Sequence, residues 1–319
     1  MIIVVILNKD NAEGLRRCLE SLARQTLRIC KDFKVLIMDG GSTDGSEEVA
    51  KEFNSKHPCI YFVRQWSGKG TGPARNDALQ VIKSKFPNCN LVVWGDSENI
   101  YENTYLEELK ERTNECLLVG GEPIVNGESV IGKSLFWYHT FYAMAPFLSK
   151  YHIAGNNLMA KLKVYDVCGE YPPIFRADDL YWNEVCRNKG MVFCLEKRAK
   201  VYVGVPEGWR DIMRWERARV RGLMEGGKFL GVITRDVFRW VAFLILYIVL
   251  VILTLINPTM FLPLLIASIA VPSIILEIYG HRYVHKPFTG IGFTSFLMML
   301  VHSVLTTVLY IEYKLIKSK

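Results

Sequence analysis

The most informative part of this chain is Val35–Ser46, VLIMDGGSTDGS. Its first four residues are apolar without interruption, which is typical of a parallel strand covered on both faces of a sheet. The strand ends on Asp39, and a turn rich in glycine and hydroxyl side chains follows it. Because ligands of α/β proteins bind at the carboxyl ends of such strands, the stretch predicts one wall of a nucleotide site.

Two further segments repeat this pattern. Ile2–Leu7 is an apolar run that ends before Asn8, and the run Leu91–Trp94 leads to Asp96. A single aspartate at a strand end is often only a turn residue or a helix cap, and we expect Asp44 to be such a cap. Polar groups at the ends of several strands together favour a ligand site at one edge of one sheet.

The order of four motifs resembles that of the family 2 glycosyltransferases of GT-A fold. These motifs are Asn8 after the first strand, the DGGSTDGS turn, GPARN at Gly72–Asn76, and DSE at Asp96–Glu98. The resemblance covers roughly residues 1–225. It implies an α/β, Rossmann-like GT-A catalytic domain with a mostly parallel sheet in residues 1–225, followed by a membrane domain in residues 226–319.

A nucleotide-diphosphate sugar is the donor that the resemblance implies. A carboxylate such as Asp39 suits the base edge and the ribose hydroxyls, and the pyrophosphate suits a divalent cation, Mg²⁺ or Mn²⁺. Asp96 and Glu98 are separated by one residue in a turn, so both carboxylates can converge on a hard cation that also contacts the donor. The chain departs from the family at two places, with Asp-x-Glu for Asp-x-Asp and with Asp39-Gly40 for two aspartates.

The resemblance also places Asn8, Lys69 and Arg75 beside the donor. Lys69 is flanked by glycines, and Arg75 follows Gly72 and Pro73 at an expected helix start, where free amides favour an anion. Simple solvation of Lys69 at the surface is the alternative.

The segment Ala154–Gly190 resembles the acceptor half of the same family. Asp178 and Asp179 begin a predicted helix, where one acid complements the helix dipole by about 0.3–1 kcal/mol. In the family the second acid of the pair is the general base, so we expect Asp179 to take this role, with Asp178 as the alternative. A sugar hydroxyl needs such a base and an ionised lipid phosphate does not, so the pair favours a hydroxyl acceptor.

A basic segment follows, WRDIMRWERARVRGLMEGGK at residues 209–228. It holds only fragments of the Gln-x-x-Arg-Trp motif of polysaccharide synthases. Arg217, Arg219 and Arg221 are expected either to bind the donor pyrophosphate or to lie on the anionic membrane surface.

Three stretches near the end of the chain, 238–256, 261–278 and 291–310, approach the length of about 20 residues that crosses a bilayer. Basic residues before the first stretch predict a catalytic domain on the cytoplasmic side of the cell membrane. Three crossings place the C-terminus outside, but Lys314, Lys317 and Lys319 argue against that. An interfacial third segment is therefore the alternative. We expect no signal peptide, since Ile2–Leu7 is too short for one.

Two other features bear on partners. The aromatic segment Ser134–Tyr151 predicts either an interfacial amphipathic helix or ordinary core packing. The net charge of +7 suits anionic lipids and phosphates, and we expect no nucleic-acid partner. The eight cysteines show no Cys-x-x-Cys pair and are interpreted as buried thiols of a reducing compartment.

These features predict a membrane-bound, metal-dependent, inverting glycosyltransferase. It would move a sugar from a nucleotide-diphosphate sugar to a hydroxyl of a lipid-linked saccharide. The alternatives are a polyprenyl (dolichyl) phosphate glycosyltransferase, a polysaccharide synthase, and an inactive scaffold that only binds a nucleotide sugar.

Overall fold

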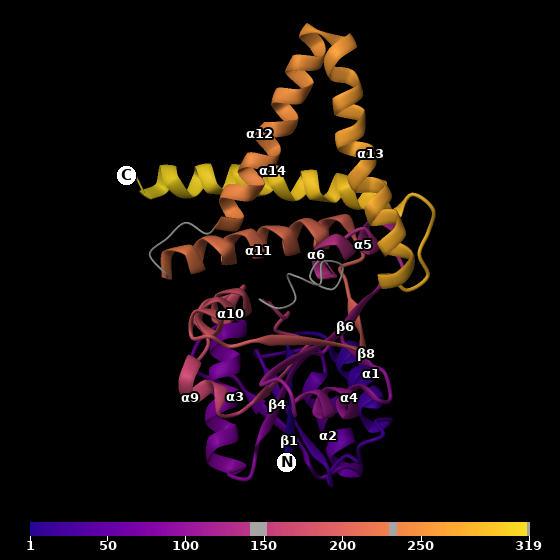
Figure 1. Cartoon of the computed structure of the whole chain (residues 1–319). Coiled ribbons are helices and arrows are strands. Elements are labelled where there is room, and N and C mark those ends of the chain that lie inside the picture. Colours follow the sequence, from indigo (N-terminus) through magenta and orange to yellow (C-terminus); the bar gives the residue numbers. More distant parts are fainter. Residues whose placement is uncertain (141–151, 230–234, 318–319) are drawn as a thin grey trace. The chain divides into compact units, whose positions relative to one another are not determined.

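The computed structural model describes residues 1–140, 152–229 and 235–317 of the chain (Figure 1). It contains two compact units, Met1–Ile124 with Tyr142–Gly204, and Val125–Phe141 with Val205–Lys319. We describe each unit by itself. The part of the predicted aromatic segment from 141 to 151 lies outside the described residues.

The first unit alternates strands and helices. Its elements are β1 (Ile2–Asn8), α1 (Ala12–Ala23), β2 (Phe33–Asp39), α2 (Ser46–Lys56), β3 (Ile60–Arg64), α3 (Thr71–Lys85), β4 (Leu91–Asp96), β5 (Ile100–Tyr101), α4 (Tyr105–Arg112), most of β6 (Leu118–Asn126), β7 (Leu158–Lys161), α9 (Val164–Cys168), α10 (Asp178–Asn188) and β8 (Phe193–Gly204).

One sheet of eight strands organises this unit, in the order β3-β2-β1-β4-β7-β6-β8-β5. Strands β3, β2, β1 and β4 are parallel, and β7 pairs antiparallel with β4 and with β6. All seven residues of β1 are buried. Ile3 and Val5 face a cluster with α3, whereas Val4 and Ile6 face a cluster with α1 and α2, so helices cover both faces as the apolar runs predict.

The register of the parallel strands brings their carboxyl ends together. Asn8 of β1 pairs with Asp39 of β2, and Leu7 pairs with Asp96 of β4. The predicted edge of polar groups is therefore present in the sheet.

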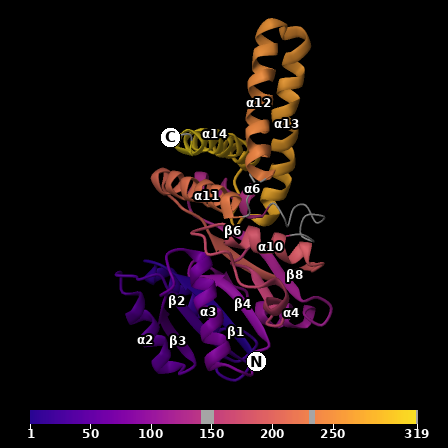
Figure 2. The ribbon, with the colours of Figure 1, turned by 90° about the vertical axis from the view of Figure 1, so that its left-hand side faces the viewer.

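The second unit is helical. It contains α5 (Val130–Lys133), α6 (Phe136–His139), α11 (Trp209–Phe229), α12 (Arg235–Ile256), α13 (Pro258–Tyr283) and α14 (Ile291–Lys317). The predicted domain boundary after residue 225 falls inside α11. Helices α12 and α13 form a hairpin around Asn257, which caps α13 through Met260 (Figure 2).

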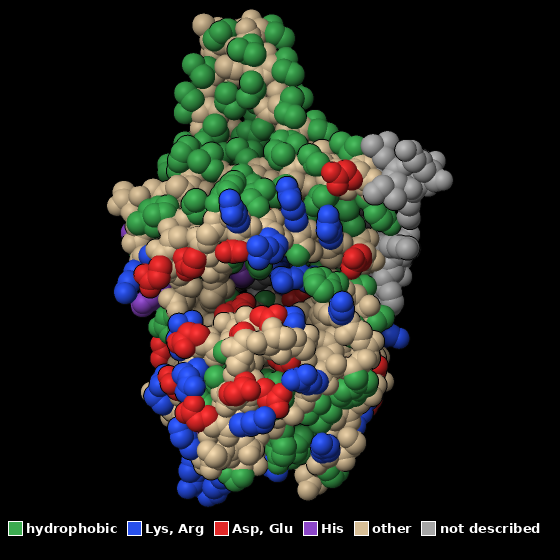
Figure 3. Space-filling model, turned by 180° about the vertical axis from the view of Figure 1, so that it is seen from behind, with side chains coloured by type: hydrophobic (Ala, Val, Ile, Leu, Met, Phe, Trp, Pro, Cys, Tyr) green, Lys and Arg blue, Asp and Glu red, His purple; other side chains and the backbone are tan. Residues whose placement is uncertain are grey.

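Three helices are long and apolar enough to cross a membrane, Val237–Ile256, Pro258–Tyr283 and Ile291–Lys314. They contain the predicted stretches 238–256, 261–278 and 291–310. In the space-filling view, hydrophobic side chains gather along the α12–α13 hairpin (Figure 3).

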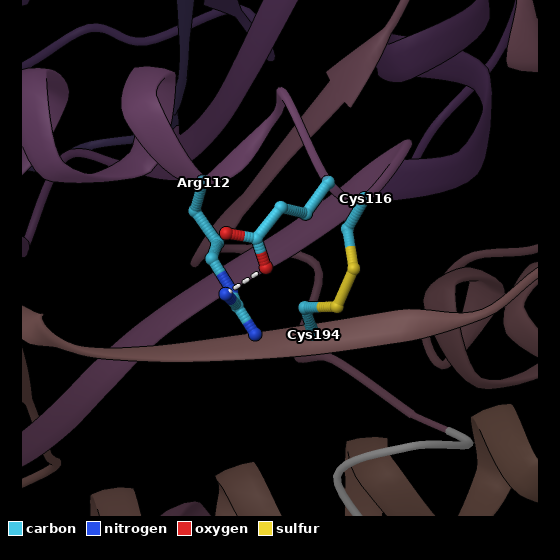
Figure 4. The surroundings of a disulfide bond; sticks show 4 residues. Arg112, Cys116 and Cys194 are labelled. Carbon is cyan, nitrogen blue, oxygen red and sulfur yellow. Dashed lines mark hydrogen bonds and ion pairs between the residues drawn. A yellow bond between two sulfur atoms is a disulfide. The ribbon is translucent and has the colours of Figure 1, made fainter.

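Two disulfide bonds correct the interpretation of the cysteines as thiols. Cys30 is bonded to Cys59, and Cys116 is bonded to Cys194 beside Arg112 (Figure 4). The partners are 29 and 78 residues apart in the chain, so only the folded sheet brings them together. Disulfides are rare in cytosolic proteins of mesophiles, but they are common in intracellular proteins of hyperthermophiles. The two bonds therefore assign no compartment to this unit. The other four cysteines are free and buried.

Candidate functional site

Asp39 organises the turn that follows β2. Its carboxylate is completely buried and accepts hydrogen bonds from the Asn8 side chain at 2.9 Å, from the Gly41 amide at 2.9 Å and from the Ser42 amide at 2.7 Å. The Ser42 hydroxyl donates a further bond at 2.5 Å. Both carboxylate oxygens are therefore engaged within the turn. Donor contacts by Asp39 and Asn8 stay predictions, and in this structure both residues shape the loop.

Asp44 also acts within the turn. It accepts hydrogen bonds from the Ala12 amide, at the start of α1, and from the Ser46 amide, at the start of α2. The predicted cap is wrong in position, because the N-cap residues of the two helices are Asn11 and Gly45, but the Asp44 side chain holds both helix starts through these amides.

Asp96 is the last residue of β4. Its side chain is half-buried, and its buried Oδ1 atom has no hydrogen-bond partner among the described residues. Burial raises the pKa of Asp96 to about 6, against the opposing effect of the Arg75 and Arg176 cations. An oxygen of this kind favours a positively charged ligand, because a buried polar atom without a partner is costly.

The described residues contain no group of three His, Cys, Asp or Glu side chains that could hold a metal ion. Asp96 and the exposed Glu98 are two carboxylates at the strand end. Two carboxylates fit the way in which Mg²⁺ is usually held, with the other ligands coming from substrate phosphates and water. The unpartnered Oδ1 of Asp96 agrees with this set of donors.

Arg75 is almost completely buried, and it makes an ion pair with the buried Asp178. It also donates a hydrogen bond to the Gly155 carbonyl at 3.0 Å and lies over the ring of Tyr171. The Thr71 hydroxyl donates a second bond to Asp178. Arg75 thus joins helices α3 and α10, and its direct contact with the donor stays a prediction.

The GPARN motif holds the segment that precedes α10. The Gly72 amide donates to the Ile174 carbonyl at 3.3 Å, and Asn76 exchanges two hydrogen bonds of 2.9 Å with the backbone of Tyr171. A Cβ atom on Gly72 would lie 2.1 Å from the Pro172 carbonyl oxygen. Glycine is required here because two backbones approach closely.

The substitution Gly72→Ala should therefore displace the backbone that carries Asp178 and Asp179. Since the obstacle is a carbonyl oxygen and not a flexible side chain, we expect a loss of about 1–3 kcal/mol in the free energy of unfolding. Denaturant titration of the two proteins measures it. Gly208→Ala is the control, since its Cβ would meet only the Asp211 carboxylate at 3.3 Å. Equal losses in both variants would contradict the close approach at Gly72.

Asp179 differs from its neighbour Asp178. Its side chain is half-buried, and its oxygens accept hydrogen bonds from two backbone amides, Gly155 at 2.7 Å and Leu180 at 2.9 Å. Amides orient a carboxylate without neutralising it. A negative charge at Asp179 also helps to raise the pKa of Asp96 after burial, so the two carboxylates belong to one site.

The residue before this pair has an unusual backbone. Ala177 has φ of 63° and ψ of 18°, in the left-handed region that a non-glycine residue seldom adopts. Residues with a strained backbone conformation are found more often at functional sites than elsewhere. Ala177 is the N-cap residue, and helix α10 begins at the next residue, Asp178.

The three arginines of helix α11 that are predicted to bind the donor lie in two different environments. Arg217 and Arg221 are exposed, and with Arg210 and Arg214 they form a stripe at helical spacing. Arg219 points elsewhere, because its guanidinium lies over the rings of Tyr138 and Trp215. Lys69 is exposed on its loop. Donor contacts by Lys69 and by these arginines stay predictions.

The comparison with known proteins identifies the family. The model of "Glycosyl transferase family 2" matches residues 1–179. The chain belongs to this family. The four motifs of the sequence all lie within the matched residues.

Two relatives of this family 2 member are named glycosyltransferases. Glycosyltransferase GlyA of Streptococcus pneumoniae is 32% identical over 179 residues, which is 56% of this chain and 22% of that protein. Glycosyltransferase AglE of Haloferax volcanii is 29% identical over 196 residues, 59% of this chain and 61% of that protein. The match thus spans less than two thirds of either relative.

A solved structure confirms the predicted α/β GT-A fold. It is the mannosyltransferase PcManGT from Pyrobaculum calidifontis in complex with GDP-Man and Mn²⁺. The likeness has a TM-score of 0.53 at 18% identity and covers 70% of this chain and 61% of that one.

Sequence reasoning missed two residues of the site. Arg176 is a cation that acts on both Asp96 and Glu98, although these residues are about 80 positions away in the chain. Its position just before the acidic pair was the available signal. Gly155 approaches Arg75 and Asp179 so closely that its Cβ would lie 2.5 Å from the guanidinium, and the Gly-Asn segment gave no hint of this contact.

Proposed function

We propose that this family 2 glycosyltransferase moves a sugar from a nucleotide-diphosphate sugar to a hydroxyl of a lipid-linked saccharide, with inversion at the anomeric carbon. The observation that carries the proposal is the unequal state of the acidic pair. Asp178 is buried against Arg75 and Thr71, whereas Asp179 keeps solvent contact and is held, among the described residues, only through backbone amides. A carboxylate of the second kind suits a general base.

In this reaction Asp179 accepts the proton of the acceptor hydroxyl while that oxygen attacks the anomeric carbon. The bond from the sugar to the nucleotide breaks on the opposite face, and the nucleotide leaves with the electron pair. The ion pair of Arg75 with Asp178 has two functions in this proposal. It fixes the start of α10, and it keeps a second negative charge beside Asp179 compensated.

The donor side is built from the strand ends. The solved mannosyltransferase was determined with GDP-Man and Mn²⁺, which supports a nucleotide-sugar donor and a divalent cation for this chain. Asp96 and Glu98 would hold the cation, Mg²⁺ or Mn²⁺. When bound, it would stabilise the negative charge of the departing nucleotide. Arg176 and Lys69 are the cations that we propose for the phosphates within this unit, and donor contacts by the exposed arginines of α11 stay a prediction.

The acceptor is proposed to come from the bilayer. Apolar helices occupy the end of the chain, and the basic residues before them favour a catalytic domain on the cytoplasmic side. The domain division that we propose is residues 1–225 for catalysis and 226–319 for the membrane. A transferase anchored in this way meets lipid-linked substrates at high local concentration.

Assay of the full-length protein in detergent tests the proposal. UDP-, GDP- and other activated sugars are each offered with a lipid-linked saccharide, with polyprenyl phosphate, or with water alone. We expect a product only with the saccharide, and its anomeric configuration by NMR opposite to that of the donor. Transfer to polyprenyl phosphate alone would favour the alternative enzyme. A growing polymer would indicate a synthase, and donor binding without any turnover would indicate a scaffold.

A further inference from the structure

Helix α14 has a polar face that is completely buried. Ser295, His302, Ser303 and Thr306 are each 0% exposed, at positions that share one side of a helix. His302 Nδ1 lies 2.5 Å from Glu216 Oε2 of α11, and Glu216 is also completely buried. A polar side packed against a charged helix is unusual for a helix that crosses a bilayer alone.

The contact between α14 and the rest of its unit is long. Near its start, Thr294 accepts a hydrogen bond from Ser134 at 2.7 Å. Toward its end, Leu309 packs with Val220 and Met224 of α11, and Tyr313 joins that cluster. From 294 to 313 the helix rises by about 28 Å, close to the thickness of the hydrocarbon core of about 30 Å.

Helix α11 cannot share that hydrocarbon region. It exposes several charged side chains along its length, and each would be costly inside a bilayer. These are Arg210, Asp211, Arg214, Arg217, Arg221 and Glu225. From His302 to Tyr313, about 16 Å along its axis, α14 packs against α11, so this part of α14 must lie where α11 lies, outside the core of the membrane.

The opposite side of α14 is apolar and exposed. Phe293, Leu297, Val304, Val308 and Ile311 are 43–51% exposed, at intervals of four, seven, four and three residues. We call these five residues the outer stripe. Helix α12 differs, since exposed apolar residues at 245, 246, 248 and 249 surround it on several sides, as in a helix immersed in lipid.

The two ribbon views show the arrangement within this unit. Helices α12 and α13 run together as a hairpin, and α14 lies across the base of that hairpin beside α11 (Figures 1 and 2). We propose that only the hairpin crosses the membrane and that α14 lies in the plane of the interface. Its outer stripe then enters the acyl chains of one leaflet, as in interfacial amphipathic helices.

The proposal rests on the membrane association proposed above, and it settles the conflict over the end of the chain. Two crossings return the chain to the side from which it started. Lys314 and the lysines after it then lie on the same side as the basic residues before α12, in agreement with the positive-inside rule.

Nitroxide labels on the full-length protein in lipid nanodiscs test the proposal. Single cysteines replace Phe293, Val304 and Ile311 on α14, and Phe238, Leu246 and Leu255 on α12, all exposed positions. Accessibility to oxygen and to a polar nickel complex gives the depth of each label. We expect one shared shallow depth along α14, and a shallow, deep, shallow series along α12, whose labels span about 25 Å.

A deep label at Val304 between two shallow ones would overturn the proposal, because it is the signature of a third crossing. Labels on α12 that contact no lipid would instead remove the membrane association itself, so the two failures are distinguishable. A reporter fused after Lys319 gives a second measurement in cells. Two crossings place it on the side of Met1, and three place it on the opposite side.

Discussion

The variant Asp179→Asn should lose sugar transfer by about 10²–10⁴-fold, the contribution of a positioned general base. Asparagine keeps the shape of the side chain, but its single carbonyl oxygen can accept from only one of the Gly155 and Leu180 amides, and it cannot take the proton of the acceptor hydroxyl. Donor affinity should change little, since the proposed role concerns the acceptor. The measurement is the single-turnover transfer rate at saturating donor, together with a donor titration.

Two matched variants sharpen this experiment. Glu184→Gln removes an exposed carboxylate from the same helix and should leave transfer unchanged. Asp178→Asn removes the partner of a buried arginine, so it should lower the free energy of unfolding by about 3–5 kcal/mol. Asp179→Asn gives up one of the two amide hydrogen bonds, so it should lose less, about 0.5–1.5 kcal/mol. Transfer by Asp179→Asn at a rate near that of the wild type would refute the base assignment and favour an acceptor that is already ionised, such as a lipid phosphate.

The second large effect is expected at Asp96. If this carboxylate holds the cation that meets the donor pyrophosphate, Asp96→Asn should lower transfer by about 10²–10³-fold, which corresponds to several kcal/mol. Calorimetric titration of nucleotide diphosphate into chelator-treated wild type should show weak binding that Mg²⁺ or Mn²⁺ restores. In the variant, the metal should restore little.

The unpartnered Oδ1 of Asp96 gives this prediction a second readout. A buried carboxylate oxygen without a partner among the described residues is unfavourable while the cation is absent, so Asp96→Asn should keep or raise the melting temperature of the metal-free protein. Asp166→Asn, the same change at an exposed position of α9, serves as the control and should alter neither property. Equal donor affinity with and without metal in the wild type would show that Asp96 has another role.

The parallel half of the sheet and its polar edge follow from local patterns in the sequence. Continuous apolar runs such as Ile2–Leu7 specify strands that are buried on both faces, and such strands deliver the residues at their ends, Asn8, Asp39 and Asp96, to one edge. Long apolar stretches similarly specify the helices that can cross a membrane, because their length and composition are local properties.

The contacts of those residues depend instead on how distant segments pack together. Arg75 and Asp178 are 103 positions apart, and nothing local shows that each neutralises the other while backbone amides hold Asp179. The disulfide partners and the contact of α14 with α11 depend in the same way on segments that are distant in the chain. Strands and helices follow from short-range periodicity, whereas a pairing of side chains follows from packing, which brings together positions that no local pattern relates.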